Sequence, residues 1–331
     1  MRRSLNEIQE TMKQFKRKHI AVISKQAGAT LVVIIIAMLF IAVLGAAVYT
    51  LTSVATLNQI HAQRAARAFY LSESGVRIAA GEYKAAANKN ATLITLHDKI
   101  FPIPDSTSNN NVKIKVYPYW FYADTSFDAG VSTLTLNLPG ELPLIDDTGD
   151  AQVTFPAGGL LRIKNLNRPG GATWSGTNFV YYSAISVGAF NPAIGRPVTF
   201  TLDTAKPPLF QSQIIAGDEF YLGSDTLTTA QAANQSGEDL IINLASTNDD
   251  YMAQIFPPRQ GTIFVVMPAS ISQYSYTSRI ITTTATPHTV KLTNIQPVAG
   301  AAAPQWPLNV DGRQIYVGKN LGFRALSTFG Q

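Results

Sequence analysis

The sequence has no cysteine and few charged residues, and both deficits exclude classes of protein. Without Cys, a disulfide framework, a thiolate metal site and a cysteine nucleophile are all excluded. Only 14% of the residues are charged while 46% are hydrophobic, which excludes a disordered, highly charged chain. The 331 residues suffice for about two domains on a prior of roughly 150 residues each.

Excess positive charge is missing from most of the chain, although the formal net charge is +5. Residues 1–28 account for all of it, because their seven basic side chains face only Glu7 and Glu10. The remaining 303 residues hold 19 basic and 19 acidic side chains. Since no basic excess is left to neutralise phosphates, we expect no nucleic acid among the partners.

Proline is absent before Pro102, and only four of the 23 glycines precede it. Because proline disrupts helix interiors, this absence permits a very long N-terminal helix. The later abundance of Pro, Gly and Asn marks turns between short strands. We therefore expect a helical region over 29–90, a linker over 91–110 and a β-rich domain over 111–331.

Charge is also absent between Gln26 and Gln63, and residues 31–48 read LVVIIIAMLFIAVLGAAV. Eighteen apolar residues form roughly 27 Å of helix, close to the hydrocarbon thickness of a bilayer. We predict a single transmembrane helix over about 30–51. The basic leader keeps the N-terminus cytoplasmic and sends the rest across the membrane. A buried core helix, or a secretory signal cut near Ala46 and Ala47, is the alternative.

After the span, small and apolar residues recur every three or four positions, which predicts an amphipathic continuation of the helix to about Asn88. The stripe consists of Ala62, Ala65, Phe69, Ser72, Val76, Ala79 and Tyr83.

The region 111–331 contains short runs rich in β-branched and aromatic residues, which predict strands. These runs are 112–122, 132–138, 179–187, 197–202, 239–244, 262–267, 279–286 and 314–317. The predicted class is α+β, a long helix followed by a large, sandwich-like antiparallel β domain. Residues 214–226 also resemble β-solenoid rungs, but no repeat of fixed period accompanies them.

The junction from Lys25 to Val33 places a basic residue and Gly28 directly before the apolar span. This segment resembles the class III leader of type IV pilins and pseudopilins. The resemblance implies that a prepilin peptidase cuts between Gly28 and Ala29, and that Ala29 becomes the N-methylated terminus. Residues 1–28 would then be a leader peptide. A glycine suits such a site because it lets an extended strand enter a tight cleft.

A second segment, residues 65–76, reads AARAFYLSESGV. It resembles the signature that follows the span in PilX-type minor pilins, and the family positions fall on Ala68, Phe69, Glu73 and Gly75. K-type minor pseudopilins of type II secretion begin similarly. The β region matches no family that we can name.

One position departs from the pattern of major pilins, which have Glu at the fifth residue after the cut. Here that residue is Val33. In the family, the Glu pairs with the amine of the subunit ahead, and a carboxylate in the span is costly without such a partner. The departure favours a minor pilin in a priming or tip complex.

Other candidate chemistry is sparse. The four histidines, His19, His61, His97 and His288, show no metal-ligand spacing. The acidic clusters at 146–150 and 248–250 are interpreted as solvated turns, with calcium as the alternative. The aromatic residues of 117–122 and 179–182 are interpreted as core packing, with a glycan or protein contact surface as the alternative. We expect no enzyme, catalytic residue, metal or cofactor.

The sequence thus predicts a minor pilin of PilX type that resides in the bacterial inner membrane and then in a pilus at the cell surface. The expected partners are a prepilin peptidase, other pilin subunits and the membrane. A K-type pseudopilin, or a single-span anchored β protein that binds a glycan or protein, is the alternative.

Overall fold

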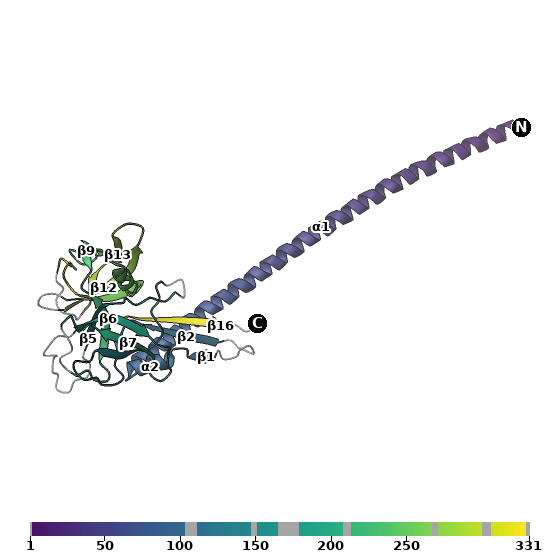
Figure 1. Cartoon of the computed structure of the whole chain (residues 1–331). Coiled ribbons are helices and arrows are strands. Elements are labelled where there is room, and N and C mark those ends of the chain that lie inside the picture. Colours follow the sequence, from purple (N-terminus) through teal and green to yellow (C-terminus); the bar gives the residue numbers. More distant parts are fainter. Residues whose placement is uncertain are drawn as a thin grey trace. The chain divides into compact units, whose positions relative to one another are not determined.

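The structure is a computed structural model that describes residues 2–102, 111–146, 151–164, 179–207, 213–266, 271–299 and 306–328. The side chains of residues 2–8, 18–29 and 328 lie outside this description. The chain forms two compact units, Met1–Phe69 and Tyr70–Gln331. A long apolar N-terminal helix and a large antiparallel β domain confirm the predicted α+β class (Figure 1).

The helix α1 (Arg2–Ala85) provides all the regular structure of the first unit. Its uninterrupted course follows from the absence of proline. Three hydroxyl groups that follow the apolar run donate hydrogen bonds to carbonyl groups one turn earlier. Thr50 bonds to Ala46, Thr52 to Val48 and Thr56 to Thr52, at 2.8–2.9 Å. These polar side chains are therefore satisfied within the helix itself.

The segment predicted as a linker over 91–110 contains regular structure instead. After α1 ends, Lys89 Nζ donates to the carbonyl oxygens of Tyr83 and Lys84, and the short helix α2 (Lys89–Leu96) begins. Asn88 caps α2 by accepting a hydrogen bond from the Ala91 N–H. Buried Leu93 and Leu96 anchor α2, and the strand β1 (Ile100–Pro102) follows. Residues 103–110 lie outside the description.

A three-stranded sheet joins the beginning and the end of the second unit, in the order β1–β2–β16. β2 (Asn111–Pro118) pairs antiparallel with β16 (Leu321–Thr328) over the full length of both strands. The side chains of β2 alternate, with Val112, Ile114 and Val116 buried. This small sheet lies beside α2 in Figure 1.

The other thirteen strands form one large antiparallel sheet. Because β3 pairs with both β4 and β8, the first six strands close into a ring. The sheet continues from β8 through β15, β11, β12, β13 and β10 to β9, and β14 pairs with β12. One continuous core joins the ring and the extension. The bounds of these strands are β3 (Phe121–Tyr122), β4 (Thr133–Leu138), β5 (Gly159–Lys164), β6 (Phe179–Val187), β7 (Arg196–Leu202), β8 (Glu219–Ser224), β9 (Thr228–Gln231), β10 (Leu240–Leu244), β11 (Arg259–Val266), β12 (Ile271–Thr282), β13 (His288–Thr293), β14 (Gln296–Pro297) and β15 (Ile315–Val317).

Four neighbouring strands of the large sheet, β5, β8, β15 and β11, are covered on both faces. In β8, Phe220 belongs to the core inside the sheet, whereas Tyr221 belongs to a second core. The second core also contains Ala79 of α1, Leu93 of α2 and Ile114 of β2. The helices and the small sheet therefore bury much of the outer face of these strands, although Arg162 of β5 is only half-buried.

Three glycines of the large sheet face a tyrosine on the neighbouring strand. A Cβ atom at each would lie 2.1–3.0 Å from the tyrosine ring or hydroxyl, so the tyrosine would have to shift to admit a side chain. The tyrosine ring fills the space above the glycine, an arrangement that stabilises such weak strand positions. The pairs are Gly159 with Tyr182, Gly223 with Tyr316, and Gly261 with Tyr276.

Candidate functional site

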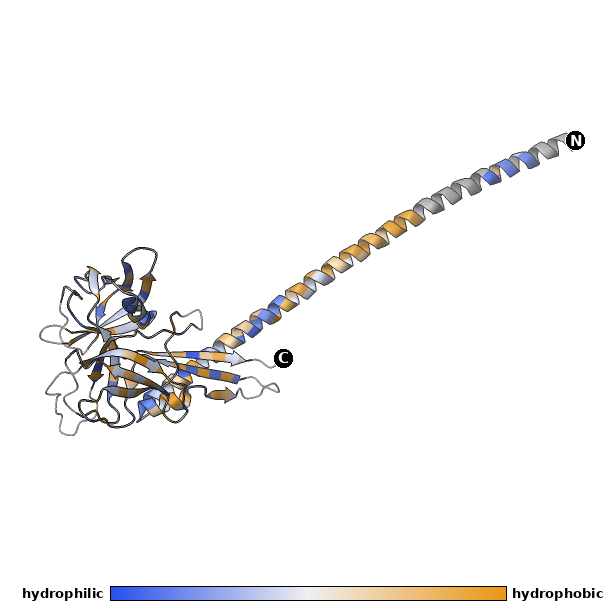
Figure 2. Ribbon diagram, viewed as in Figure 1, coloured by the Kyte–Doolittle hydropathy of each residue, from blue (hydrophilic) through white to orange (hydrophobic). Residues whose placement is uncertain are grey.

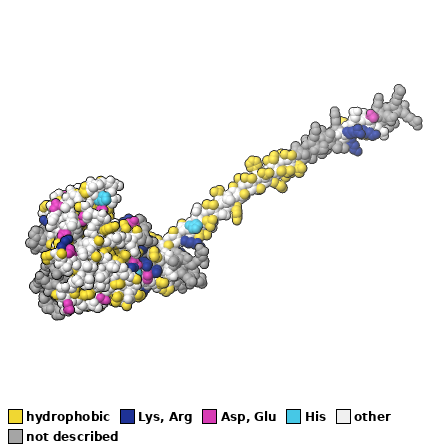
Figure 3. Space-filling model, viewed as in Figure 1, with side chains coloured by type: hydrophobic (Ala, Val, Ile, Leu, Met, Phe, Trp, Pro, Cys, Tyr) yellow, Lys and Arg dark blue, Asp and Glu magenta, His cyan; other side chains and the backbone are white. Residues whose placement is uncertain are grey.

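The apolar part of α1 is exposed on every side. Each residue from Thr30 to Thr52 is exposed, including Leu39 at 62% and Ile41 at 70%. Figure 2 shows this continuous hydrophobic stretch, and Figure 3 shows its surface. Leaving such side chains in water instead of burying them costs about 1.5–3 kcal/mol each. Among the described residues this is the one helix long and apolar enough to cross a membrane, as befits a membrane-anchored protein.

Two positions singled out in the sequence lie in or next to this apolar part of α1. Val33, the fifth residue after the predicted cut, is 64% exposed and presents an apolar side chain. The predicted cleavage site between Gly28 and Ala29 falls within α1, but the side chains there lie outside the described residues. The site stays a prediction.

The four residues of the second signature have unlike environments. Phe69 is 66% exposed and Ala68 is half-buried, and both belong to the first unit. In the second unit, Glu73 forms an exposed ion pair with Arg77 at 2.7 Å. Gly75 is buried, and a Cβ atom on it would lie 2.7 Å from Val112 Cγ1 of β2. The structure thus gives Gly75 a packing role.

The contact between α1 and the small sheet depends on small residues one turn apart. Besides Gly75, Ala79 is fully buried. Ala325 of β16 contributes a Cβ atom 3.7 Å from the position of a Gly75 Cβ, so two strands meet the helix at this point. The other glycine in this half, Gly81, has nothing within 4 Å of a Cβ position. The sequence alone does not distinguish the two glycines.

The predicted stripe of the amphipathic half is partly right. Ser72, Val76, Ala79 and Tyr83 are buried or half-buried, whereas Ala62, Ala65 and Phe69 are exposed. Spacing predicts one continuous stripe, but spacing does not indicate where the sheet begins to cover the helix.

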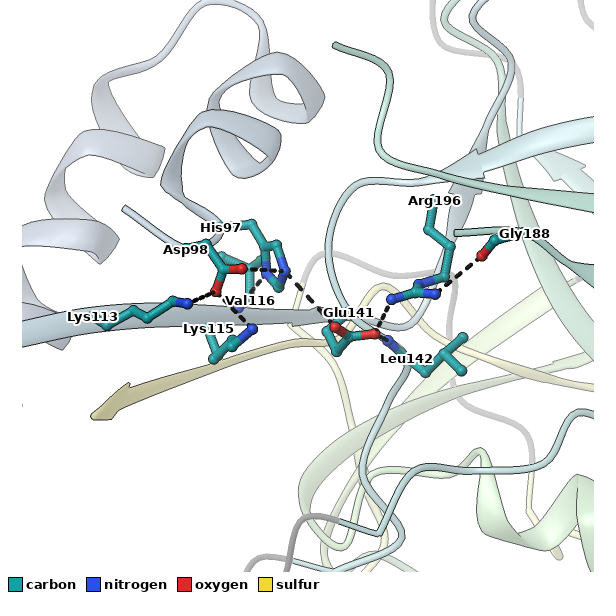
Figure 4. A network of polar contacts seen from close by, with 9 residues as sticks. All are labelled: His97, Asp98, Lys113, Lys115, Val116, Glu141, Leu142, Gly188 and Arg196. Atoms are coloured by element: carbon teal, nitrogen blue, oxygen red, sulfur yellow. Dashed lines mark hydrogen bonds and ion pairs between the residues drawn. The ribbon is translucent and has the colours of Figure 1, made fainter. Parts of the chain in front are cut away.

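A polar network connects α2 and the small sheet with the turns of the large sheet (Figure 4). His97 is the C-cap of α2, and its buried Nδ1 accepts a hydrogen bond of 3.3 Å from the Val116 N–H. In a neutral ring the proton is therefore on Nε2, which lies 3.9 Å from both Asp98 Oδ2 and Glu141 Oε2. Burial lowers the pKa of His97, and the charges of Asp98 and Glu141 only partly oppose this shift.

Both carboxylates of this network have cationic partners. Asp98 Oδ1 lies 3.1 Å from Lys113 Nζ and 2.6 Å from Lys115 Nζ. Although burial raises the pKa of Asp98, the hydrogen bonds from these lysines lower it below its ordinary value. Glu141 pairs with Arg196, which also donates to the Gly188 carbonyl oxygen at 3.0 Å. Such a compensated, half-buried network fixes elements in place.

The acidic cluster at Asn248, Asp249 and Asp250 is not a solvated turn, so that prediction was wrong. These residues belong to the helix α3 (Thr247–Gln254), which Ser246 caps. Asp249 is 1% exposed and accepts hydrogen bonds from the Thr226 hydroxyl and the Ala245 N–H. Its carboxylate is buried because those donors satisfy it. In the other cluster, residues 147–150 lie outside the description.

The histidines and aromatic residues have mainly structural positions. His288 Nδ1 lies 3.0 Å from Asp250 Oδ2, and His61 is exposed. Among the described residues, no group of three or more His, Asp or Glu side chains could hold a metal ion. The prediction of core packing is confirmed for most of the aromatic cluster, including Trp120 at 0% exposure. Half-buried Tyr181 instead lines an open cleft of about 660 Å³.

Comparison of the chain with family models, curated proteins and solved structures finds no match.

Proposed function

We propose that this chain is a minor pilin that is anchored in the bacterial inner membrane by α1, trimmed after Gly28 and assembled into a pilus or its priming complex. The observation that carries the proposal is the apolar surface of α1, exposed on all sides from Thr30 to Thr52. Such a surface needs a lipid environment before assembly and other apolar helices after it.

Local features of α1 support assembly through its apolar part. Gly45 has open space around its Cβ position, and Ala46 and Ala47 follow it. Small residues let neighbouring helices approach closely in a membrane. Val33 leaves the span without a carboxylate, which suits a subunit that has no neighbour ahead of it.

The role of the second unit in this proposal is to be carried on the helix and displayed. Gly75 and Ala79 fix residues 70–85 of α1 against the small sheet, so the β domain is held by its own packing without a disulfide. The proposed mechanism is assembly, and it requires no catalytic residue or cofactor.

The decisive experiment is mass spectrometry of the N-terminus. The full chain is expressed in paired bacterial strains, one with and one without a prepilin peptidase, and recovered from the inner membrane. We expect a chain that begins at methylated Ala29 in the first strain and at Met1 in the second. A chain that begins at Met1, or near Val48, in both strains would overturn the proposal.

Two matched variants test the site itself. Gly28→Trp should leave an uncut precursor, because a bulky side chain blocks an extended strand from the protease cleft. Gly45→Trp, also a glycine in α1, should still be cut after Gly28. Equal processing of both variants would rule out Gly28 as the recognition residue.

A further inference from the structure

Arg162 is a partly buried cation without an oxygen partner among the residues that the structure describes. It lies in β5 between Phe179 of β6 and Tyr221 of β8, which are its partners in the sheet register. The guanidinium carbon is 5.0 Å from the ring centre of Phe264 and 5.7 Å from that of Tyr316. Within the described part of the chain the Arg162 side chain forms no hydrogen bond or ion pair, and its buried Nε has no acceptor.

Three other partly buried cations have oxygen partners, although the buried Nε atoms of Arg196 and Arg279, like that of Arg162, have no acceptor among the described residues. Arg279 donates to the carbonyl oxygens of Gln254 and Phe256 at 2.6 and 2.8 Å. Arg196 has Glu141 and a backbone carbonyl, and Lys319 has Glu219. Arg162 alone among these four has only aromatic neighbours. A ring face attracts the charge, but it leaves the N–H groups of the guanidinium without acceptors.

The acidic side chains at the two ends of β8 do not accept hydrogen bonds from Arg162. Glu219 accepts hydrogen bonds from the Tyr221 hydroxyl and from Lys319. Asp225, which directly follows β8, accepts a hydrogen bond of 2.7 Å from the Tyr181 hydroxyl. Burial lowers the pKa of Arg162, as expected where no carboxylate stabilises the charge.

We propose that Arg162 is a binding site for a carboxylate group. The rings of Phe264 and Tyr316 fix the position of the guanidinium, and its N–H groups offer a planar fork that matches two carboxylate oxygens. The aromatic side chains around the fork suit a ligand with an apolar part next to its carboxylate. A free small carboxylate and the C-terminus of a peptide share this chemistry.

Titration calorimetry on the full chain in detergent micelles tests the site with four probes. These are acetate, inorganic phosphate, N-acetyl-Ala-Phe with a free carboxylate, and the same dipeptide as its amide. We expect the free dipeptide to bind and the amide not to bind. Acetate binding as tightly as the dipeptide would identify a small carboxylate as the ligand, and weaker acetate binding would identify a peptide terminus. Binding of phosphate alone would overturn the proposal.

Two substitutions and one control assign the binding to this residue. Arg162→Gln should weaken binding of the free dipeptide at least about tenfold, and Arg162→Lys should weaken it less, because a charge without the fork remains. Arg77→Gln, at an exposed arginine of α1, should leave the affinity unchanged. Equal affinity of Arg162→Gln and the unaltered protein would show that the guanidinium serves only to pack against the rings.

A measurement on the unaltered protein keeps the test valid if the Arg162 variants fail to fold. In protein labelled with ¹⁵N at arginine Nε, the free dipeptide should shift the Arg162 Nε–H resonance. The Nε–H resonances of Arg196 and Arg279, whose other nitrogen atoms already have oxygen partners, should not move. An unmoved Arg162 resonance at saturating dipeptide would refute the site.

Discussion

The two halves of α1 form the same regular helix but meet different surroundings. From Thr30 to Thr52 every side chain is exposed and the apolar residues surround the helix axis. From Tyr70 to Ala85 the helix has one packed face, centred on Gly75 and Ala79. Hydrophobicity therefore specifies the environment of the first half of the helix. In the second half, the size of individual side chains specifies which face packs against the sheet.

A charge in the first half should have the largest effect. Leu39→Lys places an ammonium group in the middle of the apolar stretch and should cost about 3 kcal/mol for insertion into a bilayer. The protein should then appear in the soluble fraction when membranes are washed with alkaline carbonate. Leu57→Lys, beyond the expected span, should leave the protein in the membrane. If both variants stayed in the membrane, the span would be placed wrongly.

A large side chain at Gly75 should break the packing of the second half. Gly75→Leu overpacks the contact with Val112 and Ile114, which should lower the free energy of unfolding by about 1–3 kcal/mol. Gly81→Leu meets open space and should raise it by up to about 1 kcal/mol, because leucine favours the helix more than glycine does. Denaturant unfolding in detergent, followed by tryptophan fluorescence, measures both. Similar effects of the two variants would remove the distinction between these glycines.

Acid should destabilise the second unit through His97. Since burial lowers its pKa in the folded state, the unfolded chain binds more protons as the pH falls below the ordinary value of 6.5. Stability should therefore fall between pH 6.5 and the lower pKa of the folded state. Asp98, whose pKa is also lowered, contributes only at more acidic pH, below its ordinary value of 3.8.

The measurement is the denaturation midpoint between pH 7.5 and 5. His97→Gln should flatten this dependence, whereas His61→Gln, in the first unit, should retain it. A slope that persists in His97→Gln would assign the effect to another group.

The smallest effect is expected at the exposed ion pair between Glu73 and Arg77. Arg77→Ala removes this i,i+4 ion pair, in which the arginine side chain is 78% exposed. Such pairs contribute about 0.3–0.5 kcal/mol to stability. The same unfolding experiment at low and high salt should show a small loss at low salt only. A loss as large as that of Gly75→Leu would mean that the charged face of the helix also carries packing.

Several strands could be predicted from sequence because their side chains alternate or their β-branched and aromatic residues cluster. The strand predicted over 179–187 has the observed bounds of β6, and that over 132–138 differs from β4 by one residue. β5 and β8 were missed because both of their faces are buried, so the period-two pattern is lost. β16 was missed because its pairing with β2, about 200 residues earlier, determines its extent.

Some features of the candidate functional site could also be predicted from the sequence, and others could not. The exposed apolar span followed from an uncharged run of residues, because local composition determines helix length and solvent preference. The acidic residue Asp249 was misassigned because its donor Thr226, 23 residues earlier in the sequence, is brought to it only by the fold. His97 gave no signal, because its partners Val116 and Glu141 are distant in sequence.

The amino-acid pattern is enough to predict the fold class, an apolar helix long enough to span a membrane, and the balance of acidic and basic residues after residue 28. These properties depend on composition and on contacts along one helix. The fold, in contrast, shows that Gly75 must be small while Gly81 need not be, and that His97 and Asp249 are buried. It also places Arg162 among aromatic rings, where the described residues offer its side chain no oxygen partner. The physical reason is that burial and pairing depend on segments distant in the chain, which the pattern of neighbouring residues does not encode.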